Sequence, residues 1–266
     1  MFQRHFRPAT FTPGAWCAVA VLAAVWGAGC APTMPANRFT GMRVDLYADL
    51  PLREGAAVAA EADGFVAAVS ARLGAKPPSP TVYVFDSDWN LWLYLRRHCP
   101  EFSWRAGACF EAGDGRLIVA VRAADDGRPD PAGLRHELTH AVIGSNFAEP
   151  MPWLDEGLAQ VFESGCPPAC DRARMAALRA LPQLDRRVVR IAGLGRNEDL
   201  DDDDHVVAWG VAWFLLEDPA YGKAAVAACL EPPVIGESAS ERFTRCVGAS
   251  PAEMGRRLAE FGAAAR

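Results

Sequence analysis

Two histidines and one glutamate stand at a spacing that suits metal chemistry. His136, Glu137 and His140 form an HExxH pattern, which zinc hydrolases use to hold a metal and activate water. Four residues is slightly more than one helical turn, so both imidazoles project the same way and can share one ion. Glu137 points about 100° away from His136, so it can reach a metal-bound water without ligating. The alternative is a pair of solvated histidines on an outward helix face.

The residues around this pattern predict the helix that it needs. Asp130 and Pro131 are typical of an N-cap and a first helical position, and Gly144 is typical of a helix end. The histidines lie roughly opposite an apolar stripe made of Leu134, Leu138, Ala141 and Val142. Because they avoid this stripe, they do not fit the pattern of core histidines.

A glutamate in the next predicted helix can supply the third protein ligand that catalytic zinc normally has. Residues 152–162 carry apolar side chains at i, i+4, i+7 and i+8 spacing, which predicts an amphipathic helix. Glu156 lies off this stripe, beside Gly157. A helical glycine costs about 1 kcal/mol relative to alanine, so Gly157 indicates close approach by another element. We expect the helix of His136 and His140 to be that element. Taken alone, Glu156 would be a surface carboxylate.

These two segments together resemble a known family. His-Glu-Leu-Thr-His followed by Trp-Leu-Asp-Glu-Gly resembles the gluzincin clan of zinc metallopeptidases and, more narrowly, the bacterial peptidase-MA-like metallopeptidases, over roughly residues 81–217. The resemblance implies one Zn²⁺ per chain, held by His136, His140 and Glu156, with Glu137 as general base in peptide-bond hydrolysis. It also implies an edge strand along which a peptide or protein substrate can add, and residues 116–121 are expected to form that strand.

The same resemblance shows a departure in a later helix. Gluzincins commonly have a tyrosine or histidine that donates a hydrogen bond to the developing oxyanion, and in the family segment a tyrosine precedes a tryptophan by four residues. Here His205 stands four residues before Trp209. We expect His205 to be the donor; the alternative is a helix-start histidine beside acidic residues. The replacement supports a rival interpretation, a peptidase-like binding lipoprotein without turnover. A cell-wall amidase is a third.

Other polar and aromatic residues have expected supporting roles. Helical spacing makes Gln160 and Glu163 candidates to fix the ligating imidazoles, as is any backbone carbonyl. The acidic run 201–204 is expected to cap the helix of His205, with a calcium site as the alternative. Core packing is expected for most of five tryptophans, and a substrate cleft is the alternative: Trp89, Trp92, Trp104, Trp209 and Trp213.

The first thirty residues read as an export signal. Arg4 and Arg7 precede an apolar run over residues 15–26, which is too short to span a membrane as a helix. Gly-Ala-Gly-Cys at 27–30 resembles a bacterial lipobox, which implies that Cys30 is lipidated and anchors an outer-membrane lipoprotein. Plain secretion is the alternative. Residues 31–40 are expected to be a tether.

Net charge narrows the possible partners, and cysteine content agrees with an exported protein. The chain has 266 residues and a formal charge of −6, which argues against nucleic-acid binding. Apart from Cys17 and Cys30, six cysteines remain, and local pairing predicts the disulfides 99–109, 166–170 and 229–246. A structural zinc site is the alternative, although no CxxC spacing occurs.

The order of predicted elements indicates an α+β protein. Strands are expected at 42–46, 81–85 and 116–121, and helices at 53–73 and 87–98, with mostly helix after residue 130. The resulting domains are an N-terminal lobe at 41–144, with a small mixed sheet and the HExxH helix, and a mainly helical C-terminal lobe at 145–266. Together with the resemblance, this predicts a gluzincin-like fold.

Overall fold

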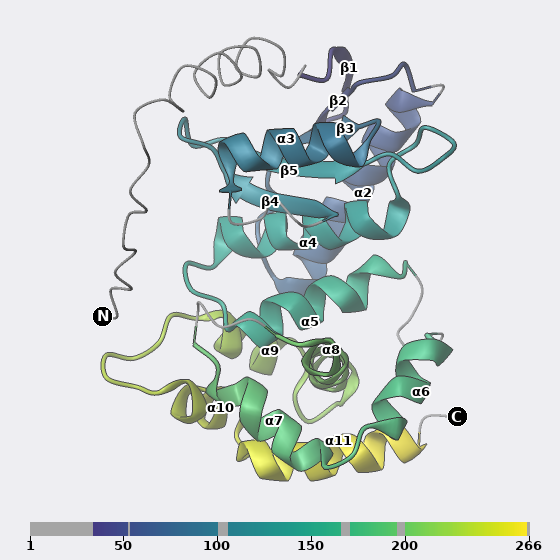
Figure 1. Cartoon of the computed structure of the whole chain (residues 1–266). Coiled ribbons are helices and arrows are strands. Elements are labelled where there is room, and N and C mark those ends of the chain that lie inside the picture. The colour runs from purple at the N-terminus through teal and green to yellow at the C-terminus, as the bar shows by residue number, and fades with distance from the viewer. Residues whose placement is uncertain (1–33, 53, 101–105, 166–170, 196–199, 265–266) are drawn as a thin grey trace, which may run out of the picture. The chain divides into compact units, whose positions relative to one another are not determined.

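A five-stranded mixed sheet is the frame of the protein (Figure 1). The computed structural model describes residues 34–52, 54–100, 106–165, 171–195 and 200–264, and the chain from Met34 onward forms one compact unit. The strands are β1 (Asn37–Thr40), β2 (Asp45–Ala48), β3 (Thr81–Phe85), β4 (Gly107–Glu111) and β5 (Leu117–Arg122). Their order is β1-β2-β3-β5-β4; β2, β3 and β5 are parallel, and β1 and β4 are antiparallel to their neighbours. This is the α+β class that the sequence predicts.

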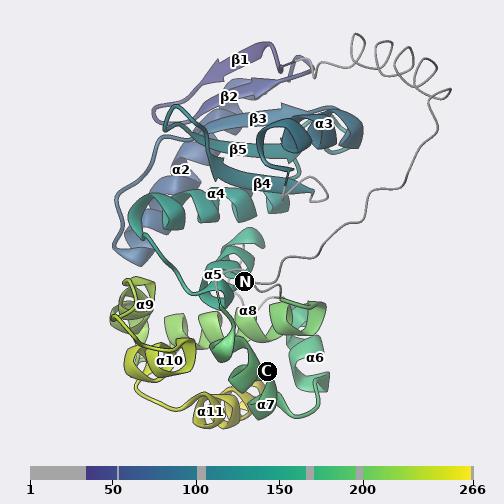
Figure 2. The same cartoon turned by 60° about the vertical axis from the view of Figure 1, so that its left-hand side comes forward.

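Helices cover both faces of the sheet (Figure 2). They are α2 (Gly55–Leu73) and α4 (Pro131–Asn146) on one face and α3 (Asp88–His98) on the other. Side chains alternate along a strand, so Val82 and Val84 of β3 face α2 and α4, whereas Tyr83 and Phe85 face α3. Burial on both sides explains why β3 and β5 are apolar almost throughout.

The C-terminal half is a group of helices around one buried helix, α8 (Asp202–Glu217). Every residue of α8 from 207 to 216 is buried, which is why its sequence is apolar all round. The helices around it are α5 (Pro152–Glu163), α6 (Arg172–Ala180), α7 (Leu184–Gly193), α9 (Gly222–Leu230), α10 (Ala239–Val247) and α11 (Pro251–Ala264) (Figure 1). Of these, α5 lies between α4 and α8, so it joins the sheet layer to the helical group.

The N-terminal strand corrects one prediction. Residues 37–40, expected to be part of a tether, form β1, and the strand expected at 42–46 lies at 45–48. The intervening turn is fixed by the buried carboxylate of Asp63, which accepts hydrogen bonds from the backbone N–H groups of Met42, Arg43 and Val44. This long-range contact from α2 stops the turn residues from pairing as a strand.

The predicted edge strand of the sheet is also corrected by the structure. The strand expected at the edge, residues 116–121, corresponds to β5, which lies between β3 and β4. The edge is β4, whose sequence Gly-Ala-Cys-Phe-Glu has none of the β-branched residues that identify β3 and β5. Any substrate that adds to this side of the sheet therefore meets β4.

Several local predictions are confirmed. Strand β3 has the predicted bounds, and α3 begins after Ser87, whose side chain accepts a hydrogen bond from the N–H of Asn90. Asp130 caps α4 and Pro131 is its first residue, but α4 continues past Gly144 to Asn146. Core packing, expected for most of the five tryptophans, holds for Trp209 and Trp213, whereas Trp92 is partly buried and Trp89 is 56% exposed.

Other predictions are only partly tested. Those for residues 1–33, for Trp104 and for the 166–170 disulfide lie outside the described residues. Cys99, Cys109, Cys229 and Cys246 carry thiols in the structure, and a hydrogen bond between the thiols of Cys229 and Cys246 shows that these two are neighbours. The disulfides 99–109 and 229–246 remain predictions. Among the described helices, none has the length and apolar character needed to cross a membrane.

Candidate metal centre

Helix α4 places the two histidines of the HExxH pattern side by side. Its start is fixed by Asp130, which accepts a hydrogen bond from the N–H of Gly133 at 3.0 Å. One turn separates His136 from His140, and their Nε2 atoms lie 3.1 Å apart. Their side chains are 21% and 16% exposed, so both can be reached from solvent without lying free in it.

Helix α5 brings Glu156 to the same point. Its Oε2 lies 3.6 Å from Nε2 of His136, and its Oε1 lies 3.9 Å from Nε2 of His140. One ligand atom from each of the three residues lies within 4.8 Å of the others. The structure therefore brings together the three residues that the sequence singled out as metal ligands.

Gly157 sets the position of α5, but through a different neighbour from the one predicted. A Cβ atom at Gly157 would lie 2.3 Å from the carbonyl oxygen of Ala208 and 3.0 Å from Cβ of Ala212, both in α8. The close approach is thus to α8 rather than to α4. The missing side chain lets α5 pack against the backbone of α8 while Glu156 faces the histidines.

Two carboxylates hold the outer ring nitrogens of the histidines. Nδ1 of His136 lies 2.8 Å from Oε2 of Glu163, one of the two predicted partners. Nδ1 of His140 lies 2.8 Å from Oδ1 of Asp155, which the sequence argument missed. The other predicted partner, Gln160, is buried nearby, and the described contacts include no bond from it to either imidazole. Asp155 precedes Glu156 directly, and the first turn of α5 points it at His140.

An arginine from α6 supports one of these carboxylates. Arg174 donates a hydrogen bond to Glu163, donates to the carbonyl oxygen of Gln160 at 2.9 Å, and pairs with Asp171 at 3.3 Å. Burial raises the pKa of Glu163, but the bonds from His136 and Arg174 outweigh it and lower that pKa overall. Glu163 is therefore an anion that orients His136.

Glu137 lies between α4 and the edge strand. A Cβ atom at Gly107 of β4 would lie 3.0 Å from Oε1 of Glu137, so the edge strand passes directly beside this carboxylate. Cys109, two residues along β4, has its pKa raised by burial and by the negative charges of Glu137 and Asp155. The predicted general base thus borders both the metal centre and the open edge of the sheet.

His205 reaches the centre from the first turn of α8. Its Nδ1 lies 3.1 Å from the carbonyl oxygen of Asp201, and its Nε2 lies 3.7 Å from Oε2 of Glu156. If Nδ1 carries the proton and donates it to this carbonyl, Nε2 is left facing the centre. The structure brings His205 to the site, as the resemblance implied.

The acidic run before His205 is used by the protein itself. Asp201 and Asp204 form a capping box at the start of α8, as predicted. Asp204, fully buried, also pairs with Arg190 at 3.0 Å, and Asp203 pairs with Arg187. Helix N–H groups and two arginines of α7 therefore occupy these carboxylates, which favours the cap over the calcium alternative.

Electrostatics couple the histidines to the surrounding carboxylates. Burial lowers the pKa of His136, but hydrogen bonds to Glu156 and Glu163 outweigh it and raise the pKa to about 9. Burial likewise lowers the pKa of His140, and the charge and hydrogen bond of Asp155 raise it to about 10. Burial raises the pKa of Glu156, but bonds to His136 and His205 lower it well below the usual range.

The centre opens into a cavity of about 410 Å³. Its lining includes His136, Glu156 and His205 from the centre, and it also includes Gln160, Glu163, Arg174, Asp202 and Val206. The cavity is within the size range of ligand sites, and its polar lining suits a charged or hydrogen-bonding ligand.

No protein-family model matches this chain, and no curated protein matches it. The resemblance to gluzincins therefore remains a prediction, which rests on the HExxH and WLDEG segments. The geometry shows two imidazoles and one carboxylate that converge on a solvent-accessible point, with His205 beside Glu156 and Glu137 beside strand β4.

Proposed function

We propose that this chain is a zinc-dependent metallopeptidase of gluzincin type, with His136, His140 and Glu156 as its metal ligands. The observation that carries the proposal is the convergence of these three side chains within 4.8 Å, with a carboxylate on the outer nitrogen of each histidine. If the histidines were only partly exposed surface residues, there would be no reason for Glu156 to approach both of them or for a carboxylate to hold the Nδ1 atom of each.

The donor set fits zinc. Two imidazoles and one carboxylate are a known ligand set for catalytic zinc, with one position left for water. The 3.1 Å between the two Nε2 atoms is close to the separation of about 3.3 Å expected for nitrogens bound to one tetrahedral zinc. Because Asp155 and Glu163 accept the Nδ1 protons, the Nε2 lone pairs are the ones that remain for a metal.

In this proposal Glu137 handles the proton. Zinc, when bound, would act as a Lewis acid toward the scissile carbonyl and lower the pKa of a water molecule to about 7. Glu137 would accept a proton from the attacking water and return it to the leaving amine. His205 would donate a hydrogen bond from Nε2 to the oxyanion, and because Nδ1 already donates to the carbonyl of Asp201, this requires the imidazolium form.

The edge strand β4 offers a place for the substrate. A peptide that pairs with Gly107–Glu111 would extend the sheet and pass beside Glu137, because a Cβ atom at Gly107 would touch that carboxylate. Backbone pairing of this kind requires a substrate with an extended peptide backbone.

We further propose that the protein is exported and anchored through Cys30, on the basis of the lipobox-like sequence alone. Mass spectrometry of the membrane-extracted protein tests this directly. A chain that begins at Cys30 and carries diacylglycerol is the expected result, and a water-soluble chain cleaved elsewhere would indicate plain secretion.

The first experiment is metal analysis of residues 34–266, the compact unit, after zinc loading and desalting. One zinc per chain is expected for the unsubstituted protein and for Glu137→Gln, and loss of zinc is expected for Glu156→Ala. Glu217→Ala, which removes an exposed carboxylate of α8, is the matched control and should keep its zinc. Absence of zinc from the unsubstituted protein would refute the metal centre.

Hydrolysis of a quenched fluorescent peptide mixture then tests catalysis. Zinc-dependent cleavage should fall by about 10²-fold or more in Glu137→Gln, because a general base is worth this much. A protein that binds zinc and peptides but cleaves none would support the rival interpretation, a binding lipoprotein without turnover.

A further inference from the structure

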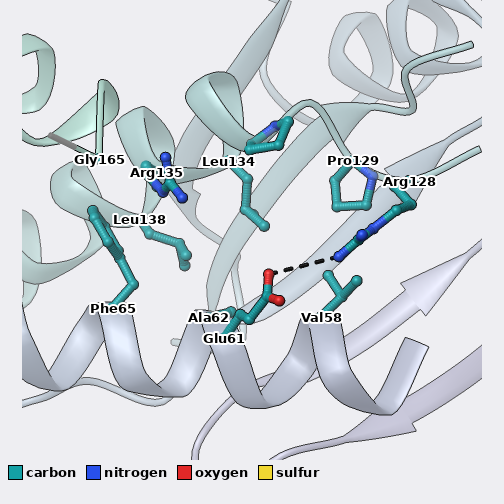
Figure 3. Close-up of a pocket in the computed structure, with 11 residues that line it drawn as sticks. Val58, Glu61, Ala62, Phe65, Arg128, Pro129, Leu134, Arg135, Leu138 and Gly165 are labelled. Atoms are coloured by element: carbon teal, nitrogen blue, oxygen red, sulfur yellow. Dashed lines mark ion pairs between the residues drawn. The ribbon is translucent and has the colours of Figure 1, made fainter. Parts of the chain in front are cut away.

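A second cavity lies between α2 and α4, on the side of α4 that carries Leu134 and Leu138 (Figure 3). Its volume is about 310 Å³, and it opens to solvent. The metal ligands His136 and His140 are absent from its lining, which comprises Val58, Glu61, Ala62, Phe65, Arg128, Pro129, Pro131, Leu134, Arg135, Leu138 and Gly165. The proposed metal chemistry therefore does not use this cavity.

The walls of this cavity are apolar. Val58 and Ala62 of α2 face Leu134 and Leu138 of α4, and all four are buried, while Phe65 is partly exposed at one end (Figure 3). An apolar ligand would displace water from these walls, which is favourable in proportion to the area covered.

Two arginines border the cavity, and they differ in their partners. Arg128 pairs with Glu54 at 3.3 Å and with Glu61 at 3.7 Å, so its charge is already compensated. Among the described residues no carboxylate forms an ion pair with Arg135, whose Nη1 lies 3.5 Å from the carbonyl oxygen of Glu163. Arg135 is partly buried. Of the two arginines at this cavity, it is therefore the one whose positive charge no described carboxylate compensates.

The chain holds Arg135 in this place. A Cβ atom at Gly165 would lie 2.2 Å from Nη1 of Arg135, so the guanidinium packs against bare backbone there. Gly165 also has a φ of +65°, a conformation that disfavours other residues. The position of the cation is therefore set by contacts rather than by free rotation in solvent.

We propose that this cavity binds an apolar chain that ends in a carboxylate, with the chain between α2 and α4 and the carboxylate on Arg135. At about 30 Å³ for each water-sized unit the cavity holds roughly ten heavy atoms, about the size of octanoate. A fatty acid and the free end of an apolar peptide share this chemistry. The site does not depend on the metal or on peptidase activity.

The proposal is tested by titrating octanoate into the metal-free protein, residues 34–266, and monitoring the NMR chemical shifts of its backbone amides. Chelation of metal excludes coordination of the carboxylate by an ion at the histidine centre. Octanoate should shift amides around Ala62 and Leu138 and bind about tenfold more tightly than 1-octanol, because a charge-assisted hydrogen bond is lost in the alcohol. Equal binding of the two, or no shifts with millimolar octanoate, would overturn it.

Variants locate the site and separate the two sources of carboxylate. Arg135→Gln should abolish the preference for octanoate over octanol, whereas Arg72→Gln, at an exposed arginine of α2 that pairs with Glu217, should retain it. Ala62→Leu should weaken both ligands by filling the cavity, and far-UV circular dichroism checks its folding. Displacement of octanoate by N-acetyl-leucine assigns the natural ligand to peptide ends, and failure to displace it assigns fatty acids. Unchanged octanoate binding in both Arg135→Gln and Ala62→Leu would refute the site.

Discussion

At the scale of single residues, the two histidines depend on the carboxylates behind them. Glu163 and Asp155 each lie 2.8 Å from an outer ring nitrogen, so each fixes the orientation and the tautomer of one imidazole. Arg174 in turn holds Glu163. Asp155 has no such arginine among the described residues and is 30% exposed. The metal ligands are therefore supported unequally, and His136 has the more extended network.

Removal of charge from either supporting carboxylate should weaken zinc binding without abolishing it. Asp155→Asn and Glu163→Gln keep the shape of the side chain but lose its charge, and a loss of about 10–100-fold in zinc affinity is expected for each. Competition with a chromogenic chelator measures the affinity, and Glu217→Gln on α8 is the control. Unchanged affinity in both variants would show that the hydrogen bonds to Nδ1 do not tune the centre.

At the scale of helices and strands, the position of α5 decides whether the centre exists. The ligand Glu156 reaches His136 and His140 because Gly157 lets α5 contact the backbone of α8. His205 comes to the same point because it lies in the first turn of α8, next to its capping box. The contact between α5 and α8 therefore places both the third ligand and the expected oxyanion donor.

Alanine at two helical glycines should have opposite effects. Gly157→Ala would force a methyl group within 2.3 Å of the carbonyl of Ala208, which is backbone and cannot rotate away, so a loss of at least about 1–3 kcal/mol in the free energy of unfolding is expected. Gly144→Ala in α4 meets nothing within 4 Å and should stabilise by about 0.5–1 kcal/mol. Urea unfolding measures both. Equal effects would contradict the packing argument, and zinc affinity should fall only in Gly157→Ala.

How far the sequence predicts the structure also depends on scale. Local signals predicted α4, its cap at Asp130, and the ligand set, because helical periodicity and capping depend on neighbours in sequence. Strand β4 and the contact of Gly157 with α8 could not be predicted in this way, since both depend on residues distant in the chain. Asp155 does not follow from the helical spacing that points to Gln160 and Glu163, because its contact with His140 depends on how α5 packs against α4.

At the scale of the whole molecule, the centre concentrates negative charge inside a chain that is already acidic, with a formal charge of −6. The carboxylates close to the histidines are Glu137, Asp155, Glu156 and Glu163, and Arg174 is the cation that pairs with one of them. In the absence of metal this arrangement favours protonated imidazoles, which is the physical reason that the pKa values of both histidines are raised. Protons and a divalent cation therefore compete for the same place.

This competition predicts how the protein responds to pH. The folded pKa values of His136 and His140, about 9 and about 10, lie above the ordinary histidine pKa of about 6.5, so imidazolium stabilises the metal-free fold fully below pH 6.5 and progressively less as pH rises through 9 to 10. Zinc needs neutral imidazole, so its affinity should change in the opposite direction and rise from pH 6 to pH 9. Because both pKa values lie above 7, both imidazoles are protonated in the metal-free protein at pH 7, and zinc binding at this pH should release about two protons.

Calorimetry in buffers of different ionisation enthalpy counts these protons, and urea unfolding of the metal-free protein at pH 6 and pH 10 measures the stability. A zinc affinity that stays constant over this range, with no proton released, would show that the histidines are neutral before the metal binds.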